Sequence, residues 1–401
     1  VDNNNNLVST GISVITTVSD SIGGKEIESV DSVKRFAPKI YSTFNRAVTA
    51  GDYEALIPKI YPEAESVSVF GGEELSPPQY GKVFITIKPF YGPFVPDSIK
   101  NNLKTQLRKY SVAGIICEIQ DLKYLYVETD VNAYYNPNLA PDANAVKTVV
   151  TNNITKYSDS SEMNKYGAKF KYSKFQGIVD NSHDAITSNI TKVEIRRDMK
   201  PALNQSAEYE LCFGNQFYIK RMDGYNIKSS GFNVFGSSNT VYLGDLPAAN
   251  GKTGSLFFFR LQGVNSPVIV SNNVGTIDYE RGEILLKAVN ITGTSKKVQD
   301  IPIIEVSACP QSNDVIGLQD LYLQLDVQKS SVDMVTDTIA SGDNTSGNLY
   351  TATSSYKSVH IARLTESEIA GSTENTSAVT SDTYTVGSTT SSPSVPSSSS
   401  Y

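Results

Sequence analysis

The chain has 401 residues, 35 basic and 42 acidic side chains, a formal net charge of -7 and a hydrophobic fraction of 39%. This length predicts two or three domains with proper cores, and the acidic balance argues against nucleic acid as the main partner. The sequence contains no run that approaches the roughly 18 apolar residues of a membrane helix, so we expect no membrane insertion.

The first 36 residues indicate the closing part of an amino-terminal β domain and a linker. Residues 12–18 alternate like a strand, and residues 20–24 have the composition of a turn. The chain opens in mid-strand without a methionine, so we expect an amino-terminal part to be missing. Asp31 is placed to cap a helix that carries Val33 and Ile40 and is interrupted at Pro38.

Residues 46–88 predict a helix followed by two strands. Thr49 and Asp52 have the spacing of a capping box, and apolar side chains recur at helical spacing after them. Pro58 predicts a kink or break in this helix. Residues 66–70 and 82–87 then alternate like strands, with a polar loop between them.

The same α+β pattern continues to about residue 200. We expect a helix from Pro96 to Tyr110, strands at residues 115–119 and 124–134, a helix at 141–157 and a strand at 190–195. The resulting prediction for residues 37–200 is a mixed sheet with helices layered on it.

Residues 201–336 predict an all-β module, because short apolar runs alternate there with Gly, Asn and Ser turns. The clearest hairpin spans residues 276–289, with its turn at residues 280–282. Another expected strand spans residues 216–220. Residues 337–401 form a Ser/Thr-rich tail that we expect not to fold by itself, and only residues 359–364 have the apolar content of a strand.

A family resemblance rests on ESVDSVKRFAPKIYSTFNRAVTAGDYEAL from Glu28, on the strand SVSVF and on the strand GKVFITIKP. APK followed by NRAVTAGDYEAL is its most specific part. These segments resemble the baseplate J-like family of contractile-tailed bacteriophages. The resemblance fades beyond about residue 197 and covers most of the chain to about residue 335, but not the tail.

The resemblance implies a structural virion protein rather than an enzyme: a wedge subunit that forms the inner ring of a contractile tail baseplate. It implies contacts of the chain with itself, as a homodimer and in a ring, and contacts with other baseplate wedge proteins. It also implies assembly in the host bacterial cytoplasm and a final place in the virion. Such a ring must pass its rearrangement to sheath contraction, and we expect hinges near Ala37 and Met199.

The sequence predicts no catalytic, cofactor-binding or metal site. The two histidines, His183 and His360, lack a matching constellation, and His183 is expected either to cap a helix end or to be solvated. GKTG at residues 251–254 lacks the preceding glycine and the strand-to-helix context of a phosphate loop. Glu73 and Glu74 are adjacent in a turn, where they point apart.

Three cysteines lie far apart in apolar, strand-like runs, and we interpret them as reduced core residues: Cys117, Cys212 and Cys309. Arg196, Arg197 and Lys200 are a compact basic group that either meets an acidic surface of another subunit or is plain protein surface. Seven tyrosines of the central region are either interface residues or ordinary strand residues: Tyr41, Tyr53, Tyr61, Tyr80, Tyr91, Tyr110 and Tyr124.

An alternative function from a different class stays open. The β-rich region would suit a host-attachment or fibre-docking protein that recognises a surface glycan. Adhesion predicts monomers or trimers that bind polysaccharide, whereas the wedge subunit predicts dimers or larger rings that do not.

Overall fold

A computed structural model describes residues 30–337, apart from 76, 93, 141, 161, 220–224, 238, 263–265, 299 and 319, together with residues 362 and 363. The expected strand at residues 12–18 and most of the Ser/Thr-rich tail lie outside the described residues. Two compact units divide the chain: unit 1 comprises Val1–Lys123 with Gln319–Tyr322, and unit 2 comprises Tyr124–Leu318 with Leu323–Tyr401. The division at 123/124 falls inside the predicted 37–200 domain; the predicted domain limits stay a prediction.

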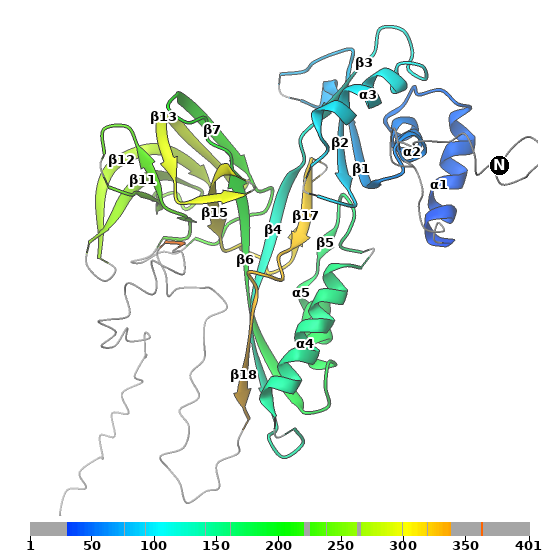
Figure 1. The fold of residues 1–401 in the computed structure, drawn as a ribbon. Helices are drawn as coiled ribbons and strands as arrows, with labels where there is room; N and C mark the ends of the chain where they lie inside the picture. The colour runs from blue at the N-terminus through cyan, green and yellow to red at the C-terminus, as the bar shows by residue number, and fades with distance from the viewer. Residues whose placement is uncertain are drawn as a thin grey trace, which may run out of the picture. The chain divides into compact units, whose positions relative to one another are not determined.

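Unit 1 consists of helices packed on a small mixed sheet (Figure 1). Its sheet has the order β1-β2-β3, in which β1 and β2 are antiparallel and β2 and β3 are parallel. The elements are α1 (Val30–Thr43), α2 (Ala50–Ile60), β1 (Ala64–Gly71), a short 3-10 helix (Gly72–Glu74), β2 (Lys82–Pro89), α3 (Asp97–Leu107) and β3 (Ile116–Gln120).

The predicted capping box of α2 is present. Thr49 Oγ1 accepts a hydrogen bond from Asp52 N at 3.3 Å, and Asp52 Oδ2 accepts one from Thr49 N at 2.9 Å. The predicted break at Pro58 is wrong, because α2 continues through it to Ile60, and α1 likewise continues through Pro38. Each proline removes one backbone hydrogen-bond donor from its helix, and the alternative of a kink at Pro58 stays a prediction.

The core of unit 1 lies between α2, α3 and the sheet. It contains Tyr53, Leu56 and Ile57 of α2, which are fully buried, and Ile85 from the middle of β2. Leu107 closes the core from α3. These are the apolar positions that the helical and strand periodicities predict.

Unit 2 contains a seven-stranded sheet with the order β14-β15-β6-β4-β17, in which β18 also pairs with β4 and β8 with β15. Its strands are β4 (Lys123–Tyr135), β6 (Ile186–Met199), β8 (Lys228–Ser229), β14 (Lys296–Val298), β15 (Ile301–Ala308), β17 (Leu321–Leu325) and β18 (Ser331–Thr336). Helices α4 (Ala143–Ser158) and α5 (Tyr172–Asp180) lie along this sheet, and β5 (Lys169–Phe170) pairs with β16 (Val315–Ile316) (Figure 1).

The long strands of this sheet connect segments that are far apart in sequence. Strand β6 pairs antiparallel with β4 and with β15, and β18 pairs parallel with the second half of β4. Met199 pairs with Ile304 and is buried. Met199 is the last residue of β6, and Ala37 lies within α1. The hinges expected near these two residues stay a prediction.

A second, six-stranded sheet of unit 2 has the order β10-β11-β12-β13-β7, with β9 paired to β13. Its strands are β7 (Ser206–Cys212), β9 (Phe232–Val234), β10 (Tyr242–Pro247), β11 (Thr253–Gln262), β12 (Ser266–Asp278) and β13 (Glu283–Thr294). The predicted hairpin is β12–β13, whose turn contains Gly282 at φ 68°. A Cβ on Gly282 would lie 2.1 Å from the carbonyl oxygen of Asn215, so this turn requires glycine.

The predicted α+β class is confirmed, with 21% of the described residues in helices and 46% in strands. The predicted strand at residues 216–220 is wrong, because its described part contains only an isolated bridge between Phe217 and Pro310.

Candidate functional site

The residues that were weighed for catalysis or metal binding have local structural roles. His183 Nδ1 accepts a hydrogen bond from Ala185 N at 3.0 Å, just after the end of α5. GKTG lies at the turn between β10 and β11, with Gly251 at φ 65°, and the described residues contain no helix after it that would make a phosphate loop. Glu74 Oε1 accepts a hydrogen bond from Gly71 N at 3.4 Å. His360 lies outside the described residues.

The three cysteines are free thiols, of which Cys309 is buried and the other two are half-buried. Within the part of the chain that the structure describes, no group of three or more His, Cys, Asp and Glu side chains is placed to hold a metal ion. No helix in that part is long and apolar enough to cross a membrane.

Of the basic group Arg196, Arg197 and Lys200, only Lys200 is exposed, and the two arginines have a different environment from either one that the sequence suggested. Arg196 is 3% exposed and Arg197 is also buried, so these side chains are neither plain surface nor a surface for an acidic partner. Adjacent residues of β6 point to opposite faces of the sheet, and both faces are covered here. Arg197 donates a hydrogen bond from Nη1 to the carbonyl oxygen of Cys212.

Arg196 is the centre of a buried ion-pair network in unit 2. Its Nε lies 2.7 Å from Glu128 Oε1, and its Nη2 lies 2.6 Å from Asp326 Oδ2. Its Nη1 pairs with Asp198 and lies 3.6 Å from Glu305 Oε1. The guanidinium also stacks on Tyr126, 4.1 Å from the ring centroid, so the donors and one face of the cation have partners.

Further cations surround the remaining carboxylates. Glu305 pairs with Lys329 and with Lys296, the latter at 3.0 Å, while Lys228 Nζ lies 3.5 Å from Glu194 Oε1. Arg363 contacts Glu128, Glu194 and Glu305. The network consists of five carboxylates and five cations, and its formal charge is zero: Glu128, Glu194, Asp198, Glu305 and Asp326 with Arg196, Lys228, Lys296, Lys329 and Arg363.

Sheet register brings these charges together. Arg196 lies opposite Tyr126 on β4 and opposite Ser307 on β15, and Asp198 lies opposite Glu305. Glu128 and Glu194 are also directly opposite each other. Two like-charged pairs therefore face each other across neighbouring strands, an arrangement that is unfavourable unless cations lie between them.

The electrostatic shifts follow from burial and from these neighbours. Burial by itself raises the pKa of Glu305, but Arg363, Lys329 and Arg196 outweigh it and lower this pKa to about 2. Burial similarly opposes ionisation of Arg196, yet Asp198, Glu128 and Glu305 raise its pKa above the ordinary value. Asp198 has a raised pKa, because burial outweighs its contact with Arg196.

This network links the paired charges of strands β4, β6 and β15 in one arrangement. Each charge has an opposite charge within the set, and Glu194 Oε1 also accepts a hydrogen bond from the buried Ser307 Oγ at 3.2 Å. Removing a partner would leave an uncompensated buried charge. Sequence reasoning missed the network, although one signal was present: Glu194, Arg196 and Asp198 occupy every second position along a strand, so their side chains share one face.

The exposed aromatic side chains of unit 1 form a candidate interaction surface. Tyr41 and Phe44 are 80% and 73% exposed, and their ring centroids are 6.1 Å apart at the end of α1. Phe44 and Asn45 have φ values of 49° and 56°, which are unusual for residues with a Cβ. We name Tyr41, Phe44 and the exposed Val48 the α1 aromatic surface. A bulky residue held in a strained, exposed position is typical of a binding surface.

The seven central tyrosines divide between the two interpretations. Tyr53 is fully buried in the core of unit 1, whereas Tyr41, Tyr80 and Tyr91 are largely exposed. The other three are half-buried: Tyr61, Tyr110 and Tyr124. Only the exposed group suits an interface.

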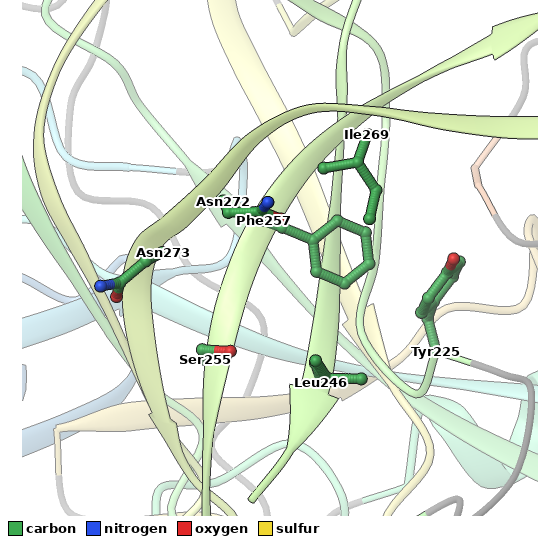
Figure 2. A pocket seen from close by; sticks show the side chains of 7 residues that line it. All are labelled: Tyr225, Leu246, Ser255, Phe257, Ile269, Asn272 and Asn273. Carbon is green, nitrogen blue, oxygen red and sulfur yellow. The ribbon is translucent and has the colours of Figure 1, made fainter.

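A pocket of about 540 Å³ lies beside β10, β11 and β12 in unit 2 (Figure 2). Its lining comprises Tyr225, Leu246, Ser255, Phe257, Ile269, Asn272 and Asn273. The rings of Tyr225 and Phe257 meet edge to face, 5.0 Å apart between centroids. Asn273 points away from these rings in Figure 2, and it accepts a hydrogen bond from Lys287 at 3.0 Å. The pocket combines aromatic surface with amide and hydroxyl groups, but it contains no acid or base.

Two consecutive regions of the chain match known protein-family models. Residues 49–120 match the model described as baseplate structural protein gp6, C-terminal domain I, and residues 123–198 match C-terminal domain III of the same protein. The junction between the two matches coincides with the division between units 1 and 2 at 123/124. The sequence matches therefore divide the chain at the same position as the contacts within the fold.

The chain is also similar to the baseplate wedge protein gp6 of Enterobacteria phage T4, with 21% identity over 203 residues. This match covers 50% of the chain and 30% of that relative's length. Among solved structures, a cryo-EM structure of the anti-feeding prophage baseplate, 6-fold symmetrised, has 16% identity and a TM-score of 0.33. It covers 43% of this chain and 39% of the other. The two domain matches and the phage relative show that this chain is similar to structural proteins of the phage tail baseplate.

Proposed function

We propose that this chain is a baseplate J-like wedge subunit that forms the inner ring of a contractile phage tail baseplate. The observation that carries the proposal is the pair of matches to gp6 C-terminal domains I and III, which follow each other along the chain and meet near the boundary between the two compact units. Two domains in the same order are a more specific signal than one. The work of such a subunit is assembly rather than turnover.

Its proposed partners are a second copy of the chain and other baseplate wedge proteins. The α1 aromatic surface is the proposed contact for self-association, because Tyr41 and Phe44 present adjacent rings to solvent. Aromatic side chains contribute a large contact area at a low entropic cost and are frequent hot spots of interfaces. Burial of two such rings is worth several kcal/mol before the costs of association, roughly 2 kcal/mol for each ring.

The buried ion-pair network supports the second part of the proposal, that the subunit passes a rearrangement from the baseplate to the sheath. Transmission requires bodies that move as units rather than deform. Because strands β4, β6 and β15 share one set of paired charges, a shift of one strand would separate several pairs at once. Unit 2 is therefore suited to move as a rigid body, so that a displacement is passed on rather than lost in deformation of the sheet.

Light scattering of the purified chain, followed by negative-stain imaging, tests the proposal. We expect dimers or larger rings whose association is weakened by the double variant Tyr41→Ala/Phe44→Ala. The control is Tyr91→Ala, which removes an equally exposed ring after β2. A strict monomer at high concentration would overturn the wedge assignment, and equal effects of the two variants would exclude the α1 aromatic surface as the contact.

A second candidate function is a host-attachment or fibre-docking protein, and the pocket beside β10 to β12 is the observation that favours it. Tyr225 and Phe257 offer ring surface, while Asn272 and Ser255 offer hydrogen-bonding groups, a combination that suits a saccharide. Binding of host polysaccharide by a monomer, abolished by Tyr225→Ala, would favour this function over the wedge subunit. The absence of binding at millimolar glycan would exclude it.

A further inference from the structure

We propose that unit 2 contains a binding site for an extended, arginine-bearing segment, and that Ala362 and Arg363 of the carboxy-terminal region are its ligand. We call this site the Arg363 receptor; it comprises Ser229, Ser230, Glu128, Glu194, Glu305, Tyr242, Phe257 and Phe259. The inference does not depend on the proposed baseplate role.

The backbone of the ligand continues the sheet. Arg363 forms a parallel bridge with Ser230, and its N–H donates to the carbonyl oxygen of Ser229 at 2.9 Å. The receptor strand is itself fixed, since Ser230 Oγ accepts from Glu305 N at 3.0 Å and Ser229 Oγ accepts from Leu243 N at 2.7 Å. Addition of a strand segment to an ordered edge is a common mode of peptide recognition.

The side chain of Ala362 is buried among apolar side chains. It is buried in a cluster with Tyr242, Phe257 and Phe259, and Tyr225 packs against the same cluster. The rings of Tyr242 and Phe259 are 5.7 Å apart, and those of Phe257 and Phe259 are 6.0 Å apart. Rings separated by these distances leave room for a small side chain, which favours alanine at this position.

The guanidinium of Arg363 is held by three carboxylates. Its Nη1 and Nη2 donate to the two oxygens of Glu128 at 3.0 and 2.9 Å, and its Nε donates to Glu305 Oε2 at 3.2 Å. Glu194 Oε2 lies 3.8 Å from Nη1. The side chain is 13% exposed. The paired bonds to Glu128 match the planar fork of a guanidinium, and an ammonium group cannot reproduce them.

Charge balance explains why these carboxylates require this ligand. The network has five carboxylates and five cations, so without Arg363 it would retain one uncompensated negative charge. Glu128 and Glu194 face each other across β4 and β6, and Arg363 is the cation of the network that contacts both of them. Arg363 completes the network, although 24 residues of the chain, 338–361, separate Ala362 and Arg363 from residue 337 at the end of the β18 region. The ligand is therefore far along the chain from the strands that bind it.

Cleavage of the full chain between ligand and receptor tests the proposal. A protease recognition sequence inserted between Gly347 and Asn348 lets the chain fold before it is cut. We expect the released carboxy-terminal fragment to co-elute with the rest of the chain in gel filtration. Arg363→Ala should weaken retention roughly 100-fold, the effect of removing one partner of a buried charge pair. Arg363→Lys should give an intermediate loss, because the charge remains and the fork is lost.

The matched control is Lys357→Ala, which removes a positive charge from the same fragment and should not change retention. Far-UV circular dichroism of each uncut chain verifies folding, and if Arg363→Ala does not fold, Arg363→Lys still provides the comparison. Separation of the unsubstituted fragment after cleavage would overturn the proposal. Equal losses for the Lys357 and Arg363 variants would also overturn it, because they would show unspecific attraction rather than a receptor for arginine.

Discussion

The two units of the chain bury very different chemistry in their interiors. Unit 1 buries Tyr53, Leu56 and Ile57 against the sheet, and its charged side chains remain near the surface. Unit 2 buries the ion-pair network around Arg196, and the formal charge of this network is zero. An apolar core tolerates small displacements, since dispersion and hydrophobic burial depend weakly on direction. A buried ion-pair network specifies one geometry, because its stabilisation depends on every partner.

The largest effect is expected for Arg196→Ala. Its removal leaves Glu128, Asp198 and Glu305 with less compensation inside the sheet of unit 2. We expect a loss of about 3–5 kcal/mol in the free energy of unfolding of unit 2. Urea denaturation followed by hydrogen exchange of each unit measures it, with exposed Arg281→Ala as the control. A loss below about 1 kcal/mol would show that the network is solvated rather than structural.

The apolar core should respond next. Leu56→Ala creates a cavity among Tyr53, Ile57 and Ile85 and should cost unit 1 about 3 kcal/mol. The change should leave hydrogen exchange in β4 and β6 unaltered, whereas the Arg196 variant should alter it. The control is Val33→Ala on the exposed side of α1. Destabilisation of both units by Leu56→Ala would contradict their energetic separation.

Acidification distinguishes the two interiors in a third way. The carboxyl pKa of Glu305 is lowered to about 2 from an ordinary value of 4.5, so its contribution to stability is complete above pH 4.5 and is lost as the pH falls through 2. Glu305→Gln should cost unit 2 about 1.5–3 kcal/mol at pH 7. The difference between variant and parent should disappear between pH 4.5 and 2 in thermal unfolding measurements. A difference that is independent of pH would indicate a packing effect of the substitution.

A smaller effect is expected at the start of α2. Thr49→Ala removes the acceptor for Asp52 N and one half of the capping box. The expected loss is about 1 kcal/mol in the stability of unit 1. Thr49→Ser, which retains the hydroxyl, is the control and should recover most of the loss in a chemical denaturation series. If serine does not rescue the variant, the methyl group rather than the cap is responsible.

The smallest predicted change is an increase in stability. Phe44 adopts a φ of 49° in an exposed position, so Phe44→Gly should relieve backbone strain and stabilise unit 1 by about 0.5 kcal/mol. The same substitution should weaken self-association if Phe44 belongs to an interface. Thermal unfolding and sedimentation velocity give the two readings, and Asn45→Gly is a control for the strain alone. A loss of stability would show that the ring of Phe44 packs within the chain.

The elements of unit 1 were predictable because their determinants are local. The capping box at Thr49 and Asp52, and the alternation in β2, place each side chain within a few residues of its partner. Even there, Pro38 and Pro58 misled, because a helix supported by packing can keep a proline. The predicted absence of a catalytic site rests on the two histidines and their neighbours in the sequence, and it stays a prediction.

The charged interior of unit 2 was not predictable in the same way. Arg196 and Glu305 are separated by more than a hundred residues, and Arg363 lies further along the chain. Two adjacent arginines look the same in the local sequence whether their side chains are exposed or buried. The alternation of Glu194, Arg196 and Asp198 shows only that these side chains share a face.

By itself, the sequence determined the class of fold, most of the helices and strands, and the resemblance to a baseplate protein. These depend on periodicity, capping and turn residues, which act over a few positions. Only the tertiary structure decided that β15 joins β6, that β18 joins β4 and that Arg196 is buried among carboxylates. The physical reason is that strand pairing and ion pairing depend on distance in space, and the chain brings together residues that local sequence cannot relate.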